Sequence, residues 1–152
     1  VRNNIFALGR LQQLSRSQAE KHQSVYFENN IVYWKEGELL DENWKDITYQ
    51  FYFSANEKNT REVSSTFEMD YNIYYNPLLS LDSITFNGRS WKQWQEAGKD
   101  IHSQFADPLF KDIEHYNFTL QKNSPAFSNG FKPINMDDVG PRKKKIDTIS
   151  HK

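Results

Sequence analysis

Three carboxylates, Glu28, Glu68 and Asp70, could do acid–base chemistry if the fold brings them to one face. Paired carboxylates about 5 to 10 Å apart hydrolyse glycosidic bonds, one as acid and the other as nucleophile or base. Crowding of like charges raises one of their pKa values, which is the usual route to a general acid. The same face could instead hold a calcium ion, since hard cations bind clustered oxygens. The plainer alternative is that outward strand positions are polar and that Arg2 neutralises them.

A short unit that occurs three times determines where those side chains lie. The units are residues 1–7, 27–33 and 69–75, and each is a β-type run that reaches an Asn, turns and leaves through Ile. The Asn-Ile steps lie 26 and then 42 residues apart, which is typical of stacked repeats. Asn tolerates the positive φ of a sharp corner, and stacked Asn side chains can hydrogen-bond to one another. The alternative is three unrelated strand–turn segments.

Alignment of the three units predicts a column of side chains. Arg2, Glu28 and Asp70 each lie two residues before the Asn of the Asn-Ile step, so stacking in register places them about 5 Å apart on neighbouring strands. Glu68 lies two residues before Asp70 and therefore on the same face of its strand. The opposite, inward face is predicted to carry Phe67, Met69 and Tyr71.

Aromatic side chains are the candidates for sugar contacts, because their faces offer a large contact area. Trp44 lies in a polar segment and is predicted to contact sugar. Tyr26 and Arg2 share the predicted outward face and are further candidates for substrate binding. Trp91 and Trp94, spaced three apart on a predicted helix, are expected to anchor a cap instead.

A second group of titratable residues follows that helix: Asp100, His102 and Asp107. A His between carboxylates can shuttle protons or bind a metal. A hydrogen-bonding network in a turn is the reading that we favour. We predict no metal site, with calcium on the carboxylate face left as an open alternative, and no other cofactor.

The composition limits the class of protein. The chain has 152 residues, the size of one domain, and is 37% hydrophobic and 26% charged. A net charge of −1 argues against a general binder of nucleic acid or of membrane surfaces, and no apolar run is long enough to cross a bilayer. Without cysteine, neither a disulfide nor a Cys-based zinc site is available.

The elements that must position these residues are mostly short strands. Residues 22–34 predict a strand, a corner and a second strand, and residues 9–21 predict a loop or a short helical excursion. Residues 35–65 form an insertion that opens with a charged, turn-like part and holds a strong strand at residues 47–53. A full extra coil is the competing explanation for that insertion. Residues 78–86 are loosely β.

The C-terminal third carries start and stop signals for short elements. Ser90 followed by Gln93 is a capping box that opens a short helix, and residues 116–121 alternate as a strand. Ser124 before a Pro begins a one-turn helix that Gly130 ends. Residues 135–152 form a polar tail that contains the basic run RKKK. We expect this tail to be solvated and partly disordered. The alternative is that the basic run is an arm that binds nucleic acid or an anionic surface.

Several motifs together resemble one family. After the corner units NNIF, NNIVYW and YNIYYN come FNGRSWKQWQEAGKDIHS at residues 86–103, ADPLF at residues 106–110 and NFTLQKNSPAFSNGF at residues 117–131. These resemble the C-terminal end of right-handed parallel β-helix proteins of the pectate-lyase-like superfamily, in particular large bacterial carbohydrate-active members. The resemblance covers most of residues 1–134. The insertion at residues 35–65 and the small number of coils, about three, depart from the family pattern.

The resemblance implies a mainly β fold: about three coils of a right-handed parallel β-helix with short helices and a C-terminal capping segment, over residues 1–134. It implies a secreted or periplasmic glycoside hydrolase or polysaccharide lyase acting on a polysaccharide or oligosaccharide. Val1 opens inside a repeat unit, so we expect a piece of a longer protein that is inactive alone. Its partners would be further N-terminal coils, or a second copy through the open first coil. The alternative is a non-catalytic glycan-binding or surface structural β-helix module.

Overall fold

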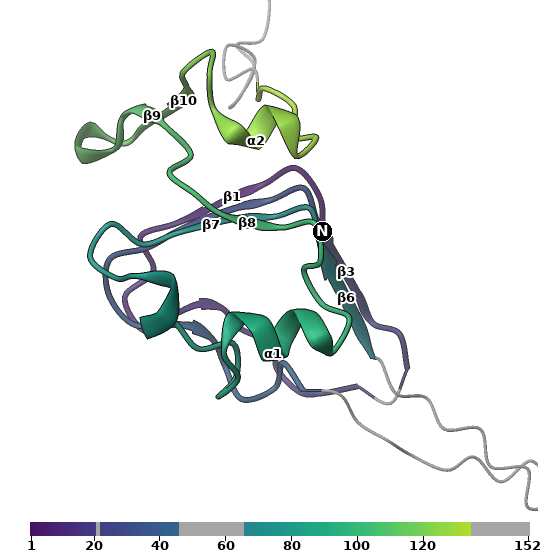
Figure 1. The fold of residues 1–152 in the computed structure, drawn as a ribbon. Coiled ribbons are helices and arrows are strands. Elements are labelled where there is room, and N and C mark those ends of the chain that lie inside the picture. The colour runs from purple at the N-terminus through teal and green to yellow at the C-terminus, as the bar shows by residue number, and fades with distance from the viewer. Residues whose placement is uncertain (21, 46–65, 135–152) are drawn as a thin grey trace, which may run out of the picture.

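The computed structural model describes residues 1–20, 22–45 and 66–134 (Figure 1). This part of the chain is mainly β, as the sequence predicted, and its helices are short. None of the described helices is long and apolar enough to cross a membrane. The elements are β1 (Ile5–Ala7), β2 (Gln12–Leu14), β3 (Val25–Glu28), β4 (Ile31–Tyr33), β5 (Glu38–Leu40), β6 (Phe67–Asp70), β7 (Ile73–Tyr75), a 3-10 turn (Leu81–Ser83), α1 (Trp91–Glu96), β8 (Gln104–Phe105), β9 (Phe110–Asp112), a second 3-10 turn (Ile113–His115), β10 (Asn117–Leu120) and α2 (Pro125–Ser128).

The strands form several small sheets, and the repeat determines their register. The largest sheet is parallel, in the order β1-β4-β7-β8, while β2-β5 and β3-β6 are separate parallel pairs and β9-β10 is antiparallel. Ile5 pairs with Ile31, and Ile31 pairs with Ile73. Partners in β1-β4 and β2-β5 are 26 residues apart, and those in β3-β6 and β4-β7 are 42 apart. The predicted alignment of the three units is therefore confirmed.

The Asn of each Asn-Ile step belongs to a ladder of side chains that crosses the strands. The N–H of Asn4 donates to Oδ1 of Asn30 at 3.0 Å, and the N–H of Asn30 donates to Oδ1 of Asn72 at 3.0 Å. Ser103 continues the ladder, because its Oγ accepts from the N–H of Asn72 at 2.7 Å. Asn30 and Asn72 are buried, so these bonds satisfy backbone groups that water does not reach. The predicted bonding between stacked Asn residues is confirmed.

The corner itself lies one residue earlier than predicted. Positive φ angles occur at Asn3 (57°), Asn29 (54°) and Tyr71 (56°), and not at the Asn of the Asn-Ile step. The prediction that Tyr71 points inward is wrong: it is 43% exposed, whereas Phe67 and Met69 are buried as predicted. In–out alternation holds only along an extended strand, so it fails where the chain enters the left-handed corner.

The four-stranded sheet has a hydrophobic core on each face. Alternate residues of the sheet point to opposite sides. Val32 and Tyr74 belong to an inner core with Phe27, Trp34 and other aromatic residues. On the other face, Ile31, Tyr33 and Ile73 pack against β9, β10 and α2, which lie above the sheet in Figure 1. We call β9, β10, α2 and residues 129–134 the outer layer. Burial on both faces is typical of parallel sheets.

Both predicted short helices are present. Ser90 and Gln93 form the predicted capping box at the start of α1, whose Trp94 is buried and stacks on Phe67 at 5.9 Å between ring centroids. Trp91, half-buried, packs against the same core. Both Trp residues therefore anchor α1 on this core, and their role in capping a coil stack stays a prediction. Ser124 caps α2 by accepting from the N–H of Ala126, with Pro125 at the first helical position.

Three local predictions were wrong, the first two because strand pairing is non-local. Residues 9–21 contain β2, and the segment after Lys35, predicted to be turn-like, contains β5. Each three-residue strand is stabilised by its pairing with the other, which neither segment reveals alone. Residues 78–86 contain a 3-10 turn instead of a loose strand. The predicted strand at residues 47–53 and the tail at residues 135–152 lie outside the described residues.

Candidate functional site

The predicted carboxylate column is present on the outward side of the β3-β6 pair. Arg2 forms an isolated parallel bridge with Glu28, and Glu28 pairs with Asp70 in the β3-β6 ladder. Tyr26 pairs with Glu68 one step along the same ladder. Paired residues on neighbouring strands are separated by about 4.8 Å. We call Arg2, Tyr26, Glu28, Glu68 and Asp70 the outward face.

Two of the three carboxylates of the outward face have a side-chain partner, Glu28 in an ion pair and Asp70 in hydrogen bonds. Oε2 of Glu28 lies 2.7 Å from a guanidinium nitrogen of Arg2, which is the neutralisation that the sequence allowed. Oδ2 of Asp70 lies 2.7 Å from Nδ1 of His102, and Oδ1 of Asp70 accepts from the N–H of His102 at 2.7 Å. Both carboxylates therefore have a cationic or hydrogen-bonding partner, while Glu68 lies exposed beside them.

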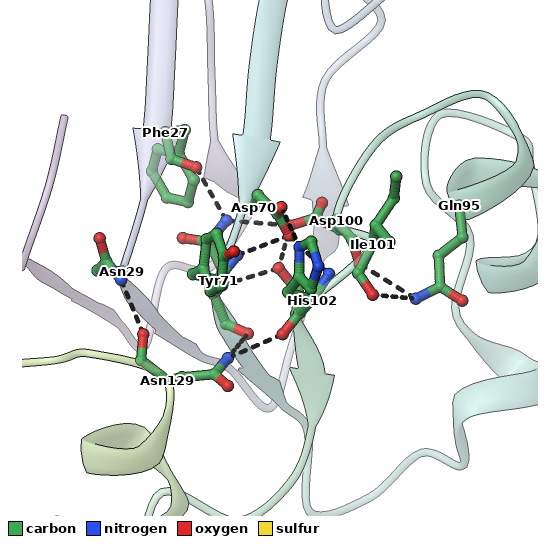
Figure 2. Close-up of polar contacts among 11 residues, drawn as sticks. Phe27, Asn29, Asp70, Tyr71, Gln95, Asp100, Ile101, His102 and Asn129 are labelled. Carbon is green, nitrogen blue, oxygen red and sulfur yellow. Dashed lines mark hydrogen bonds and ion pairs between the residues drawn. The ribbon is translucent and has the colours of Figure 1, made fainter.

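His102 is the residue of this site that sequence reasoning placed wrongly. It was predicted to lie with Asp100 and Asp107, but it lies against Asp70, and its ring stacks on that of Tyr71 with centroids 4.7 Å apart and planes 5° from parallel (Figure 2). A signal was present in the sequence. Residues 100–105 are a degenerate fourth unit in which Ser103 stands at the ladder position of Asn72.

Asp100 lies in a separate, buried network. Its carboxylate accepts from Nε1 of Trp94 at 2.8 Å, from Oγ of Ser103 at 2.6 Å and from the hydroxyl of Tyr74 at 3.1 Å. Nδ2 of Asn72 also donates to it, at 3.0 Å. Burial raises the pKa of Asp100 above its ordinary value, and these hydrogen bonds oppose the rise. The favoured prediction, a hydrogen-bonding turn network, is confirmed for Asp100.

The burial of this network also affects Tyr74. Loss of water raises the pKa of its hydroxyl well above the ordinary value, and the nearby Asp100 carboxylate raises it further. Asp107 belongs to neither group, because Oδ1 of Asp107 accepts from the N–H of Leu109 in its own turn. Asp100, His102 and Asp107 are therefore three separate features and not one cluster.

The predicted sugar contact at Trp44 is not compatible with its position. Trp44 is 4% exposed and packs edge-on against Phe27 and Phe67. Its Nε1 donates to the carbonyl of Leu14 at 3.0 Å, and the guanidinium of Arg16 lies 5.2 Å from its ring centroid. The segment looked solvated because its neighbours in sequence are charged, but the ring packs into the core against side chains of β3 and β6.

The exposed aromatic rings of this region are tyrosines. Tyr26 is 47% exposed on the outward face, and Tyr71 is 43% exposed at the corner that follows β6. Together with Arg2 and the carboxylates, they present ring faces beside charged hydrogen-bonding groups, which is the kind of surface that contacts sugars. The sugar-binding roles of Tyr26 and Arg2 and the catalytic roles of Glu28, Glu68 and Asp70 stay predictions.

Metal binding finds no support from the described side chains. Among residues 1–20, 22–45 and 66–134, no group of three or more His, Asp or Glu residues is arranged to hold an ion. On the outward face, Arg2 lies beside Glu28 and His102 lies beside Asp70. Calcium on this face stays an open alternative.

No family model, curated protein or solved structure matches this chain. Its function therefore has to be inferred from the arrangement of its own side chains. The outward face offers the Arg2–Glu28 ion pair, the hydrogen-bonded Asp70, the exposed Glu68 and the ring of Tyr26 on a pair of strands. Such a face can bind a polar, ring-containing ligand.

Proposed function

We propose that this chain forms the C-terminal coils and cap of a right-handed parallel β-helix in a secreted or periplasmic carbohydrate-active protein, a glycoside hydrolase or polysaccharide lyase. In this proposal the chain alone is inactive. Its outward face holds a polysaccharide or oligosaccharide chain that is cleaved elsewhere in the protein. The resemblance of the corner units and the closing segment to the pectate-lyase-like superfamily is the starting point.

The observation that carries the coil proposal is the shared offset of the strand pairs. β1-β4 and β2-β5 pair residues 26 apart, and β3-β6 and β4-β7 pair residues 42 apart. A chain that winds in successive coils gives one offset to every sheet that the same two coils share. Separate sheets with independent connections would have no reason to agree. The Asn ladder adds support, because it repeats at one corner of each coil.

The glycan part of the proposal rests on the outward face. Tyr26 offers a partly exposed ring, and Arg2 and Glu68 offer hydrogen-bonding groups on the same side of the strands. A sugar stacked on Tyr26 would place its hydroxyls within reach of those groups. Because the strands are paired over four residues, the face is rigid and loses little entropy on binding.

Glycan binding tests this proposal directly. The chain is titrated with a panel of neutral and acidic oligosaccharides by isothermal calorimetry, as wild type, Tyr26→Ala and Tyr116→Ala. Tyr116 is the matched control, since it is an exposed tyrosine on the distant β9-β10 side. We expect binding to weaken roughly tenfold in Tyr26→Ala only. Absence of binding across the panel, or equal loss in both variants, would sink the glycan proposal.

A second candidate function is a non-catalytic glycan-binding or structural module, and the partners of Glu28 and Asp70 favour it. Glycoside hydrolysis uses two carboxylates, whereas Glu28 and Asp70 contact Arg2 and His102, which leaves Glu68 as the exposed carboxylate of the face. Cleavage assays on the natural protein separate the two, with new reducing ends indicating hydrolysis and a new double bond in the ultraviolet spectrum indicating elimination. Glycan binding without either product would select the non-catalytic module.

A further inference from the structure

The four-stranded sheet has an open edge at β1. Among the described residues, β1 pairs with β4 alone. The carbonyl of Asn4 accepts from Ile31 at 2.9 Å, and the N–H of Leu8 donates to Tyr33 at 2.9 Å. Because backbone groups alternate in direction along a strand, the N–H and C=O groups of Ile5 and Ala7 point away from β4. An edge of this kind is a template for another strand.

The Asn ladder points to the same missing neighbour. At each step, a side-chain oxygen accepts the N–H of the ladder residue in the preceding unit: Asn30 accepts from Asn4, and Asn72 accepts from Asn30. Asn4 stands first in this series. Its Nδ2 donates to the carbonyl of Arg2 at 2.6 Å and to Oδ1 of Asn30 at 3.3 Å. By the pattern of Asn30 and Asn72, Oδ1 of Asn4 would accept the N–H of a preceding ladder residue.

Burial also decreases toward the β1 edge. Ile31 and Ile73, at equivalent positions in β4 and β7, are 0% and 1% exposed. Ile5, their equivalent in β1, is only half-buried. One more strand beside β1 would bury Ile5 as fully as Ile31 and Ile73 are buried. The gain in free energy is about 25 cal/mol for each Å² of apolar surface covered.

An apolar pocket lies between β1 and the outer layer. It has a volume of about 960 Å³. On one side it is lined by Ile5 and Ala7 of β1, and on the other by residues of the outer layer that include Phe118, Phe131 and Ile134. Side chains of a further strand beside β1 would therefore meet apolar walls of the outer layer.

Residues 129–132 follow the corners of the units toward this edge. Asn129 donates through Nδ2 to the carbonyl of Asn72 at 3.2 Å, and its own carbonyl accepts from Nδ2 of Asn29 at 2.7 Å (Figure 2). Lys132 exchanges two hydrogen bonds with Asn3: its N–H donates at 2.6 Å and its carbonyl accepts at 3.1 Å. The segment therefore crosses the units in the order β7, β4, β1 and then reaches the pocket at Ile134.

We propose that the β1 edge is a strand-acceptor site for one further coil of the same repeat, added parallel to β1 and held under the outer layer. The N–H of its ladder residue donates to Oδ1 of Asn4. The two side chains equivalent to Ile31 and Tyr33 fill the pocket. This inference rests on the coil arrangement of the proposed function and adds the sequence pattern and the register of the partner strand.

A peptide copy of residues 27–34 is the probe, because it carries the unit in the required pattern. In β4, Asn30 and Trp34 bond to β7, whereas Ile31 and Tyr33 bond to β1. A copy seated on β1 therefore turns the N–H of its Val32 toward β1 and the N–H of its Tyr33 outward. Methylation of the Val32 amide in the peptide should weaken binding to the 152-residue chain roughly tenfold, through one lost hydrogen bond and a steric clash. Methylation of the adjacent Tyr33 amide is the matched control and should leave binding unchanged.

Binding is measured by fluorescence anisotropy of the labelled peptides, with sedimentation equilibrium of the chain alone. Saturable binding that only the Val32 methyl group weakens supports the strand-acceptor site. No saturable binding, or equal weakening by both methyl groups, overturns it. A dimer that the peptide dissociates would overturn the further coil as the occupant and assign the edge to a second copy. Peptide binding is independent of the glycan titration, so either proposal can fail while the other stands.

Discussion

Replacement of Asn72 by Ala tests whether the Asn ladder stabilises the fold. Oδ1 of Asn72 accepts from the N–H and Nδ2 of Asn30 at 3.0 and 3.2 Å. Nδ2 of Asn72 donates to the carbonyl of Phe27 at 2.9 Å and to Asp100 at 3.0 Å. At about 1 kcal/mol net for each bond, Asn72→Ala should lower the free energy of unfolding by about 4 kcal/mol. Domains of this size have only about 5 to 15 kcal/mol in total.

The matched control is Asn4→Ala, at the same position of the first unit. Asn4 is exposed, and its side chain donates two hydrogen bonds that water can replace. We expect a cost of about 1 kcal/mol. Urea unfolding followed by tryptophan fluorescence and by far-ultraviolet circular dichroism gives both values. If Asn72→Ala cost no more than Asn4→Ala, the buried ladder would contribute nothing and the reasoning would be refuted.

Three further predictions concern backbone strain, burial and pH. Gly37→Ala should destabilise the chain by more than Gly88→Ala in urea unfolding. Both glycines have positive φ, but a Cβ at Gly37 would lie 2.4 Å from the carbonyl oxygen of Leu11, whereas Gly88 faces open space. Trp44→Ala should lower the free energy of unfolding by about 3 to 5 kcal/mol and leave the glycan affinity of the folded fraction unchanged. A loss of affinity without a loss of stability would contradict the position of Trp44 in the core. Burial raises the pKa of Asp100 above 3.8, so between these two pKa values the folded chain holds a proton that the unfolded chain releases. The contribution of Asp100 to stability is therefore lost as pH rises from 3.8 through the folded pKa. Asp100→Asn should abolish that part of the pH dependence of the urea midpoint, and an unchanged profile would refute the prediction.

Short-range features of this protein could be predicted from the sequence. The capping box at Ser90, the one-turn helix after Ser124 and the strand at β10 depend on residues within one turn or one strand of each other. The register of the three units also followed from sequence, because a shared Asn-Ile step leaves one alignment that keeps Ile5, Ile31 and Ile73 on one face.

The candidate site was predicted only in part, because some of its contacts join segments that lie far apart in the sequence. The alignment placed Arg2, Glu28 and Asp70 in one column, and their pairing bears this out. It missed His102, because the unit that carries it is degenerate and its imidazole meets Asp70 across 32 residues of chain. The burial of Trp44 was likewise invisible, since the rings that cover it, Phe27 and Phe67, lie on two strands far from it in sequence.

The sequence by itself determined the repeat, the direction of the strands and the polarity of the outward face, because these follow from periodic side-chain pattern and turn chemistry. Only the tertiary structure decided which residue takes the left-handed corner, which side chain contacts Asp70, and that an apolar pocket lies between β1 and the outer layer. Each of these depends on contacts between segments far apart in the chain. Such contacts are selected by packing and desolvation in three dimensions, and a local pattern does not encode them.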